Sequence, residues 1–177
     1  MTNLTGKKIA MVIAPVNFRD EELLQPKKIL EKKGAVINIA SKGVSEATGM
    51  LGAKVKVDSD LGTIKAEDYD AIVFIGGSGA NIYFNDLYAL DLVKNAVKLG
   101  KIVGAICIAP SILANAGVLR SKRATAFNSE IDVLRKSGAA YVNNFVVKDG
   151  NIITAKGPTA AKAFGEELLK ALMFNHS

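Results

Sequence analysis

The sequence has few of the residues that most often build catalytic and metal sites, since its 177 residues include one cysteine, Cys107, and one histidine, His176. A lone cysteine excludes an internal disulfide and any cysteine-rich zinc site. The histidine is next to last in the chain, where chains are usually mobile, so a histidine-based catalytic triad is not expected. Neither a metal nor an organic cofactor is predicted.

Long apolar runs are also missing. No run reaches the roughly 18–20 residues that a helix needs to cross a bilayer. The first eight residues are polar and lack the apolar core and cleavage site of a signal peptide. We therefore expect a cytoplasmic protein without membrane contact.

Positive charge is in excess, with 23 basic against 17 acidic residues and a net charge of +6. The basic residues gather on one predicted helix as Lys27, Lys28, Lys32 and Lys33, with Glu31 among them. Because no aromatic residues alternate with them, this pattern indicates a solvated helix face and not a nucleic-acid surface.

Short apolar runs alternate with helical patterns along the whole chain. With 49% hydrophobic residues, the length suits one domain over residues 1–177. Apolar runs that follow helices in this way predict a flavodoxin-like, doubly wound α/β fold with a mostly parallel sheet. The expected strands are 8–14, 36–41, 71–75 and 102–106, and the expected helices are 20–33, 86–99 and 110–116.

Two segments interrupt this rhythm. Residues 43–60 contain an alternating stretch and are expected to form a small hairpin. Asp149-Gly150 lies between the apolar runs 141–148 and 151–155, which predicts a second hairpin. Residues 158–174 are then expected to form the last helix, with proline in its first turn.

Ligands of open parallel sheets bind outside the carboxyl ends of the strands. Cys107 directly follows a predicted strand, and Pro110 begins a helix three residues later. The chain must turn sharply there, as in a nucleophile elbow. Amides of the helix start favour the thiolate and can bind an oxyanion, although a lone cysteine elsewhere often only fills space.

Two further features are placed near this elbow. Gly76-Gly77 ends the neighbouring strand and either lets the backbone approach a ligand or simply makes a turn. Glu22 opens the first predicted helix, where an acidic residue commonly only complements the helix dipole. Neither feature identifies a function alone.

Together these motifs resemble the ThiJ/PfpI superfamily, also called DJ-one-like. The matching motifs are Glu22 with Pro26 four residues on, the strand that ends in Gly76-Gly77, the elbow 105–110, and Asp149-Gly150 followed by Gly157-Pro158. The resemblance implies that Cys107 is an oxidisable nucleophile and that Glu22 is protonated and hydrogen-bonded to it. It also implies an oxyanion pocket from the amides of Gly77 and Ile108, beside Gly76, and a homodimer or larger homo-oligomer.

The sequence departs from this family at the histidines. The protease-like branch has histidine directly after the cysteine, where Ile108 stands here, and another branch has one near Ala126. Without a base that protonates a poor amine leaving group, peptidase activity is not expected, and neither is efficient glyoxalase activity.

Three hypotheses follow. The first is a cysteine-dependent enzyme that acts on small carbonyl compounds, their adducts or amides, as a deglycase, amidase or weak glyoxalase. The second is a non-catalytic oxidative-stress sensor or chaperone with an oxidisable Cys107. The third, a glutaminase-like domain, needs a histidine–glutamate pair that His176 does not readily supply. Other residues either line a pocket over the cysteine or pack elsewhere: Phe18, Tyr83, Phe84, Phe127, Asn17, Asn81 and Asn128.

Overall fold

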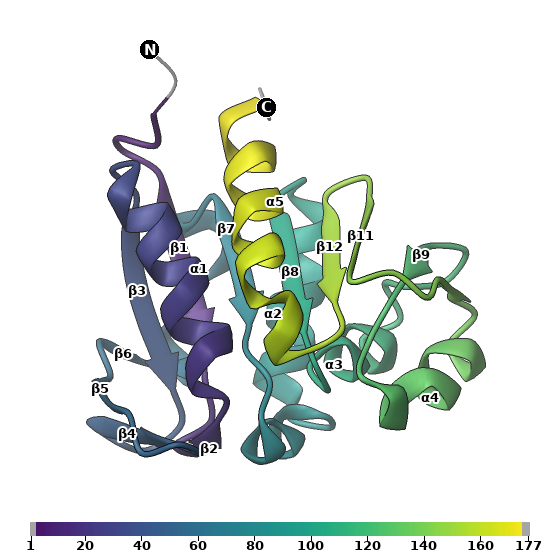
Figure 1. Ribbon diagram of the computed structural model, residues 1–177, viewed down its shortest axis with the longest axis horizontal. Helices are drawn as coiled ribbons and strands as arrows, with labels where there is room; N and C mark the ends of the chain where they lie inside the picture. Colours follow the sequence, from purple (N-terminus) through teal and green to yellow (C-terminus); the bar gives the residue numbers. More distant parts are fainter. Residues whose placement is uncertain (1–2, 175–177) are drawn as a thin grey trace.

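A seven-stranded sheet forms the centre of the molecule, in the order β11-β12-β8-β7-β1-β3-β6 (Figure 1). The computed structural model describes residues 3–174. Neighbouring strands are parallel except at the edge, where β11 and β12 are antiparallel. The strands are β1 (Lys8–Val12), β3 (Val36–Ser41), β6 (Ser59–Asp60), β7 (Ala71–Phe74), β8 (Ile102–Ile106), β11 (Val146–Asp149) and β12 (Ile152–Ala155). The predicted doubly wound α/β fold is confirmed.

Helices cover both faces of this sheet. One face carries α1 and α5, which pack so closely that a side chain at Gly165 of α5 would meet the backbone of Pro26 at 2.9 Å. The other face carries α2 and α3 (Figure 1). The helices are α1 (Asp20–Lys32), α2 (Leu87–Lys98), α3 (Pro110–Asn115), α4 (Ile131–Lys136) and α5 (Ala161–Phe174).

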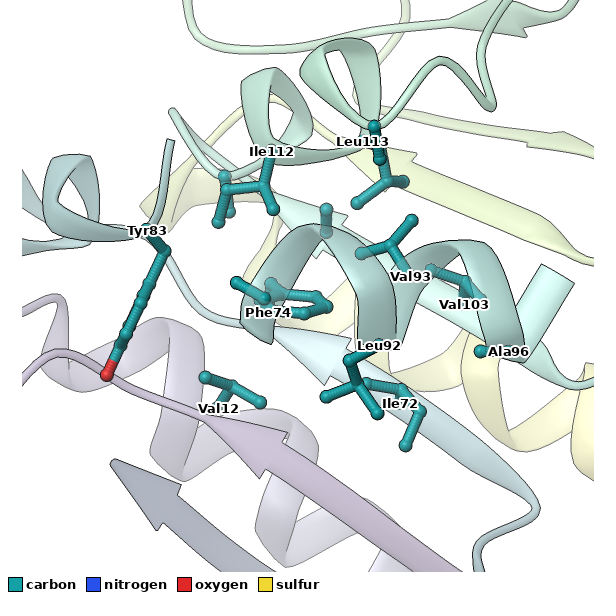
Figure 2. Close-up of a cluster of buried hydrophobic side chains, with 14 of the residues drawn as sticks. Val12, Ile72, Phe74, Tyr83, Leu92, Val93, Ala96, Val103, Ile112 and Leu113 are labelled. Carbon is teal, nitrogen blue, oxygen red and sulfur yellow. The ribbon is translucent and has the colours of Figure 1, made fainter. Parts of the chain in front are cut away.

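Strand residues alternate between two hydrophobic cores. Ile72 and Phe74 of β7 point toward Leu92 and Val93 of α2, as Figure 2 shows, and both are fully buried. Val73, between them, belongs to the cluster under α1 and α5. Because both faces of the sheet are covered, the central strands are continuous apolar runs.

A smaller three-stranded sheet lies beside the start of α1. Strands β4 (Glu46–Gly49) and β5 (Lys54–Lys56) form the expected hairpin, and β2 (Val16–Phe18) joins β4 in parallel. Both carboxylate oxygens of Asp20 accept hydrogen bonds from the hairpin turn, from the amides of Leu51 at 2.9 Å and Ala53 at 2.8 Å. The hairpin is thereby fixed to α1 close to Glu22.

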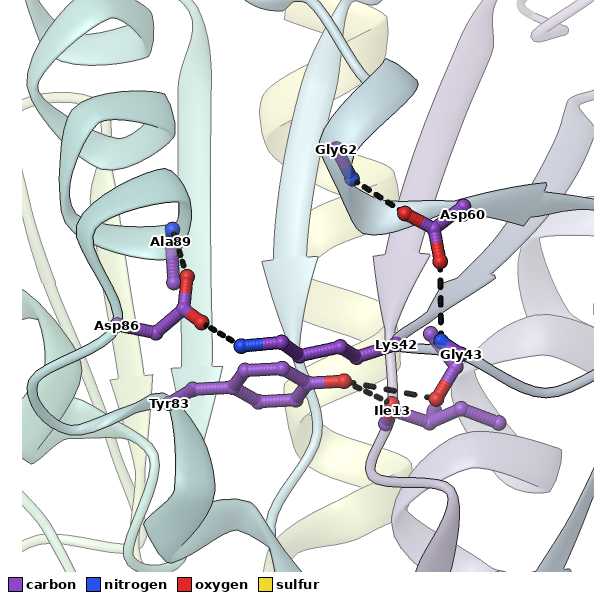
Figure 3. Close-up of polar contacts among 9 residues, drawn as sticks. Ile13, Lys42, Gly43, Asp60, Gly62, Tyr83, Asp86 and Ala89 are labelled. Carbon is purple, nitrogen blue, oxygen red and sulfur yellow. Dashed lines mark hydrogen bonds and ion pairs between the residues drawn. The ribbon is translucent and has the colours of Figure 1, made fainter.

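A polar cluster joins the end of β3 to the start of α2 (Figure 3). Lys42 forms an ion pair with Asp86 at 2.5 Å, and Asp86 caps α2 by accepting a hydrogen bond from the Ala89 amide. The hydroxyl of Tyr83 donates to the Ile13 carbonyl at 2.8 Å. Tyr83 is buried, so it belongs to the core and not to a pocket over the cysteine.

The segment before β11 differs from its expected form. A strand was predicted over 141–148, but β11 begins only at Val146. Tyr141 instead belongs to β10 (Ala140–Tyr141), which pairs in parallel with β9 (Arg123–Ala124). The pairing of β9 with β10 and the helix α4 were not predicted, because they depend on contacts between segments that are distant in the sequence. Within residues 3–174, no helix is both long and apolar enough to cross a membrane.

Candidate active site

Cys107 lies at a strained turn between β8 and α3. It is one of few residues other than glycine with a positive φ, at 68°, a conformation that costs about 1–2 kcal/mol. Two hydrogen bonds fix its backbone: its N–H donates to the Ala155 carbonyl at 3.0 Å, and its carbonyl accepts from the Phe127 amide at 2.8 Å. The elbow predicted from the sequence is therefore present, and hydrogen bonds to β12 and to Phe127 hold its backbone in place.

Glu22 reaches this elbow from the first turn of α1. Its side chain is completely buried, and its Oε1 accepts a hydrogen bond from the Gly76 amide at 3.0 Å. Oε2 has no partner of ordinary hydrogen-bond geometry, and the side chain that interacts with the carboxyl is Cys107. A buried carboxyl with one oxygen directed to no other group is well placed to keep its proton and offer it to sulfur.

Gly76 allows the thiol and the carboxyl to approach each other. A Cβ atom at this position would lie 2.4 Å from Cys107 Cβ and 2.6 Å from Glu22 Oε1. Gly77 has a φ of 99°, and a Cβ there would lie 2.3 Å from the Arg19 amide nitrogen. Both positions therefore require glycine for steric reasons, and the loop after β7 meets Arg19 and the Cys107 elbow at the carboxyl edge of the sheet.

Two backbone amides influence the sulfur. The N–H groups of Gly77 and Ile108 act as donors toward it and lower the pKa of the Cys107 thiol. These are the two amides that the family resemblance implies for an oxyanion pocket. The Gly76 amide is already bound to Glu22, so Gly76 contributes close approach and no free donor.

The carboxyl and the thiol oppose each other's ionisation. Burial raises the pKa of Glu22 to about 8, although the Cys107 thiol and the Gly76 amide lower it. Burial, followed by the charge of ionised Glu22, raises the pKa of Cys107 to about 12. The thiolate that the helix start was expected to favour is therefore opposed, chiefly by burial of the sulfur.

Below about pH 8 Glu22 keeps its proton, so the carboxylate charge that opposes the thiolate is absent. Burial then remains as the main influence against the thiolate, and the two amides favour it. A protonated carboxyl that donates to the sulfur would favour the thiolate as well. Because both groups compete for ionisation, they titrate as a pair, in which the first proton lost makes the second harder to remove.

Glu22 should make the free energy of unfolding depend on pH. Its pKa is about 8 in the folded protein and 4.5 in the reference state, so the folded form binds more protons between these values. Stability is therefore full below about pH 4.5 and falls by several kcal/mol as pH rises to 8. Urea denaturation at pH 5 and pH 8 should show this fall in wild type and a much smaller one in Glu22→Gln. An equal loss of unfolding free energy between pH 5 and pH 8 in wild type and Glu22→Gln would contradict the raised pKa of Glu22.

Of the other predicted pocket residues, the structure places some in the core and others beside a cavity. Phe18 is fully buried in the core, as Tyr83 is, whereas Phe127 is 46% exposed and lines a cavity with Asn128. Ala126, where a family branch carries histidine, is fully buried. His176 lies outside the described residues.

Sequence reasoning did not identify Lys156 and Thr159, which line the same cavity. They flank Gly157-Pro158, which the family resemblance had singled out, so this motif was the available signal.

A parallel α/β sheet that holds a strained cysteine and a buried carboxyl at its carboxyl edge defines a cysteine-elbow protein of the ThiJ/PfpI type. The model of the DJ-1/PfpI family matches residues 7–171, and the chain belongs to this family.

Individual relatives and solved structures agree with this family assignment. An uncharacterized protein of Methanocaldococcus jannaschii is 42% identical over 177 residues, covering 98% of this chain and 86% of its own. The protein named deglycase PH1704 of Pyrococcus horikoshii is 33% identical over 155 residues, covering 88% and 93%. The crystal structure of a ThiJ/PfpI domain protein from Brachyspira murdochii superposes with a TM-score of 0.91 at 33% identity, covering 94% and 98%.

Proposed function

We propose that this protein is a cysteine-dependent enzyme that acts on small carbonyl compounds, their adducts or amides, with Cys107 as the nucleophile. The observation that supports this most is the buried Glu22 carboxyl beside a strained thiol that two backbone amides also approach. Relatives of about 30% identity that carry the name deglycase support the same class.

The first chemical step is an addition. The Cys107 thiol loses its proton to water, and the resulting thiolate attacks the carbonyl carbon. A C–S bond forms, and the electron pair of the C=O double bond moves to oxygen. The amides of Gly77 and Ile108 stabilise this oxyanion. Glu22 then transfers its proton to it, which leaves a neutral hemithioacetal and a carboxylate that accepts a proton in a later step.

Glu22 would carry the proton transfers that a histidine carries in other branches. Ala126 has no titratable group, and Ile108 offers only its amide. A carboxyl whose pKa is raised to about 8 can donate and accept protons near neutral pH. It suits carbonyl additions better than peptide cleavage, where an amine leaving group must be protonated.

Methylglyoxal consumption tests this proposal. We expect the protein to remove many equivalents of methylglyoxal, and we expect iodoacetamide to stop the reaction in proportion to the fraction of Cys107 alkylated. The lone cysteine makes this titration unambiguous. Consumption that ends at one equivalent per chain, or that survives complete alkylation, would overturn the enzymatic proposal.

A non-catalytic oxidation sensor is the second candidate. The same donors that surround the sulfur would also hydrogen-bond to the oxygens of a sulfinate and stabilise it. Under this alternative, methylglyoxal consumption stops at one equivalent, and peroxide converts Cys107 stoichiometrically to its sulfinic acid.

Self-association as a homodimer or larger homo-oligomer stays a prediction. Exposed apolar side chains of Val16, Met50 and Leu51 come from β2 and the β4–β5 turn. We propose these side chains as a contact surface for a second copy of the chain.

A further inference from the structure

A cavity lies beside the cysteine elbow, on the side of β12 and α5. Strands β8 and β12 are parallel neighbours, so the start of α5 and the elbow lie at the same edge of the sheet (Figure 1). The cavity is lined by Phe127, Asn128, Lys156, Gly157, Pro158 and Thr159.

Both walls of this cavity are connected directly to Cys107. The N–H of Cys107 donates to Ala155, the residue before Lys156, and its carbonyl accepts from the amide of Phe127. The walls also approach each other, since a Cβ at Gly157 would lie 3.4 Å from the Phe127 ring. The two segments that form the cavity walls are therefore the same segments that hold the backbone of Cys107 in place.

The lining has one cation and no acid. Lys156 is half-buried, and its ammonium group donates to the amide oxygen of Asn143. Within residues 3–174 it has no carboxylate partner in an ion pair. Its backbone is fixed by a hydrogen bond from its N–H to the Phe145 carbonyl at 3.0 Å, so the side chain starts from a defined position.

The carboxylate on the neighbouring loop has other partners. Glu130 does not line the cavity, and its two oxygens accept hydrogen bonds from Ser111 at 2.7 Å and Ser129 at 2.6 Å. The cation of Lys156 is thus left available to an anion from outside the chain. Asn128 and Thr159 offer additional polar groups to such an anion.

We infer that this cavity is the anionic subsite of the active centre, in which Lys156 binds the carboxylate of a substrate whose carbonyl carbon meets Cys107. The inference deepens the proposed function and rests on it. It narrows the substrate class to carbonyl compounds that carry a carboxylate, such as 2-oxo acids and carboxylate-bearing adducts.

Alkylation of Cys107 tests the subsite without requiring turnover. Two matched reagent pairs differ in charge: iodoacetate against iodoacetamide, and 3-maleimidopropionate against N-ethylmaleimide, whose carboxylate reaches further from sulfur. The ratio of the anionic to the neutral rate reports carboxylate binding, since any change in thiol reactivity affects both rates. We expect Lys156→Gln to lower this ratio by about three- to tenfold for at least one pair and to leave the neutral rate unchanged.

Two further variants complete the experiment. Lys98→Gln removes an equal charge at the far end of α2 and should leave both ratios at the wild-type value. Lys156→Arg keeps the charge and should keep most of the ratio, which covers the case that the glutamine variant folds poorly. Ratios that are equal in wild type, Lys156→Gln and Lys98→Gln for both pairs would overturn the subsite. Because modification is stoichiometric, this result is independent of whether methylglyoxal is turned over.

Discussion

Replacing Cys107 with alanine is expected to abolish methylglyoxal turnover while the protein stays folded. Without sulfur no covalent adduct forms, and the amides of Gly77 and Ile108 have no oxyanion to stabilise. Alanine keeps the Cβ atom, so the strained φ of 68° is tolerated no worse than in the wild-type protein. Steady-state consumption of methylglyoxal and a thermal melt together measure both parts of this prediction.

Two controls make this test specific. Cys107→Ser keeps a polar atom at the elbow but has no easily ionised group, so it should be as inactive as alanine. Lys98→Gln, at the far end of α2, should retain wild-type activity. Turnover that persists in folded Cys107→Ala would show that Cys107 is not the nucleophile.

Introducing a methyl group at Gly76 is expected to lower the stability of the protein strongly. The Cβ atom of Gly76→Ala would lie 2.4 Å from Cys107 Cβ and 2.7 Å from the Ile106 carbonyl oxygen. These neighbours belong to β8 and the fixed elbow, so they cannot move aside cheaply. Overpacking at such a site costs about 1–3 kcal/mol or more, and separation of the thiol from Glu22 should also slow alkylation. Urea denaturation measures the loss.

Gly100→Ala is a control without steric contact. Gly100 has a φ of 71°, but nothing lies within 4 Å of a Cβ atom built there. It therefore reports the cost of a side chain at positive φ alone, about 1 kcal/mol. Gly76 is not among the glycines with positive φ, so a larger loss there is steric. If Gly76→Ala is no less stable than Gly100→Ala, the steric account of Gly76 is incorrect.

Local patterns in the sequence were enough to predict the scaffold of the site. The apolar run 102–106 followed by Cys107 and Pro110 predicts a strand, a sharp turn and a helix, because these features act within a few residues. Asp149-Gly150 likewise predicts the hairpin of β11 and β12, which the structure confirms. The pairing of β10 with β9 was not predicted, because the two strands lie far apart in the sequence.

The electrostatics of the pair depend on the tertiary structure. At the start of a helix an acidic residue commonly only complements the dipole, and it was the family resemblance that implied a protonated Glu22. In the structure α1 packs on the sheet and buries this residue completely. The raised pKa results chiefly from this burial, and one hydrogen bond comes from Gly76, 54 residues away. Whether the thiol is opposed by a carboxylate or supported by a carboxyl O–H therefore cannot be derived from the order of residues alone.

By itself, then, the sequence determined the fold class, the elbow and the identity of its nucleophile candidate, because hydrophobic periodicity and turn residues act locally. Only the tertiary structure decided that Gly76 must lack a side chain, that Tyr83 belongs to the core, and that Lys156 faces a cavity beside Cys107. Steric contact, desolvation and charge depend on distances between atoms, and these are fixed only when β7, β8, β12 and α1 pack against one another.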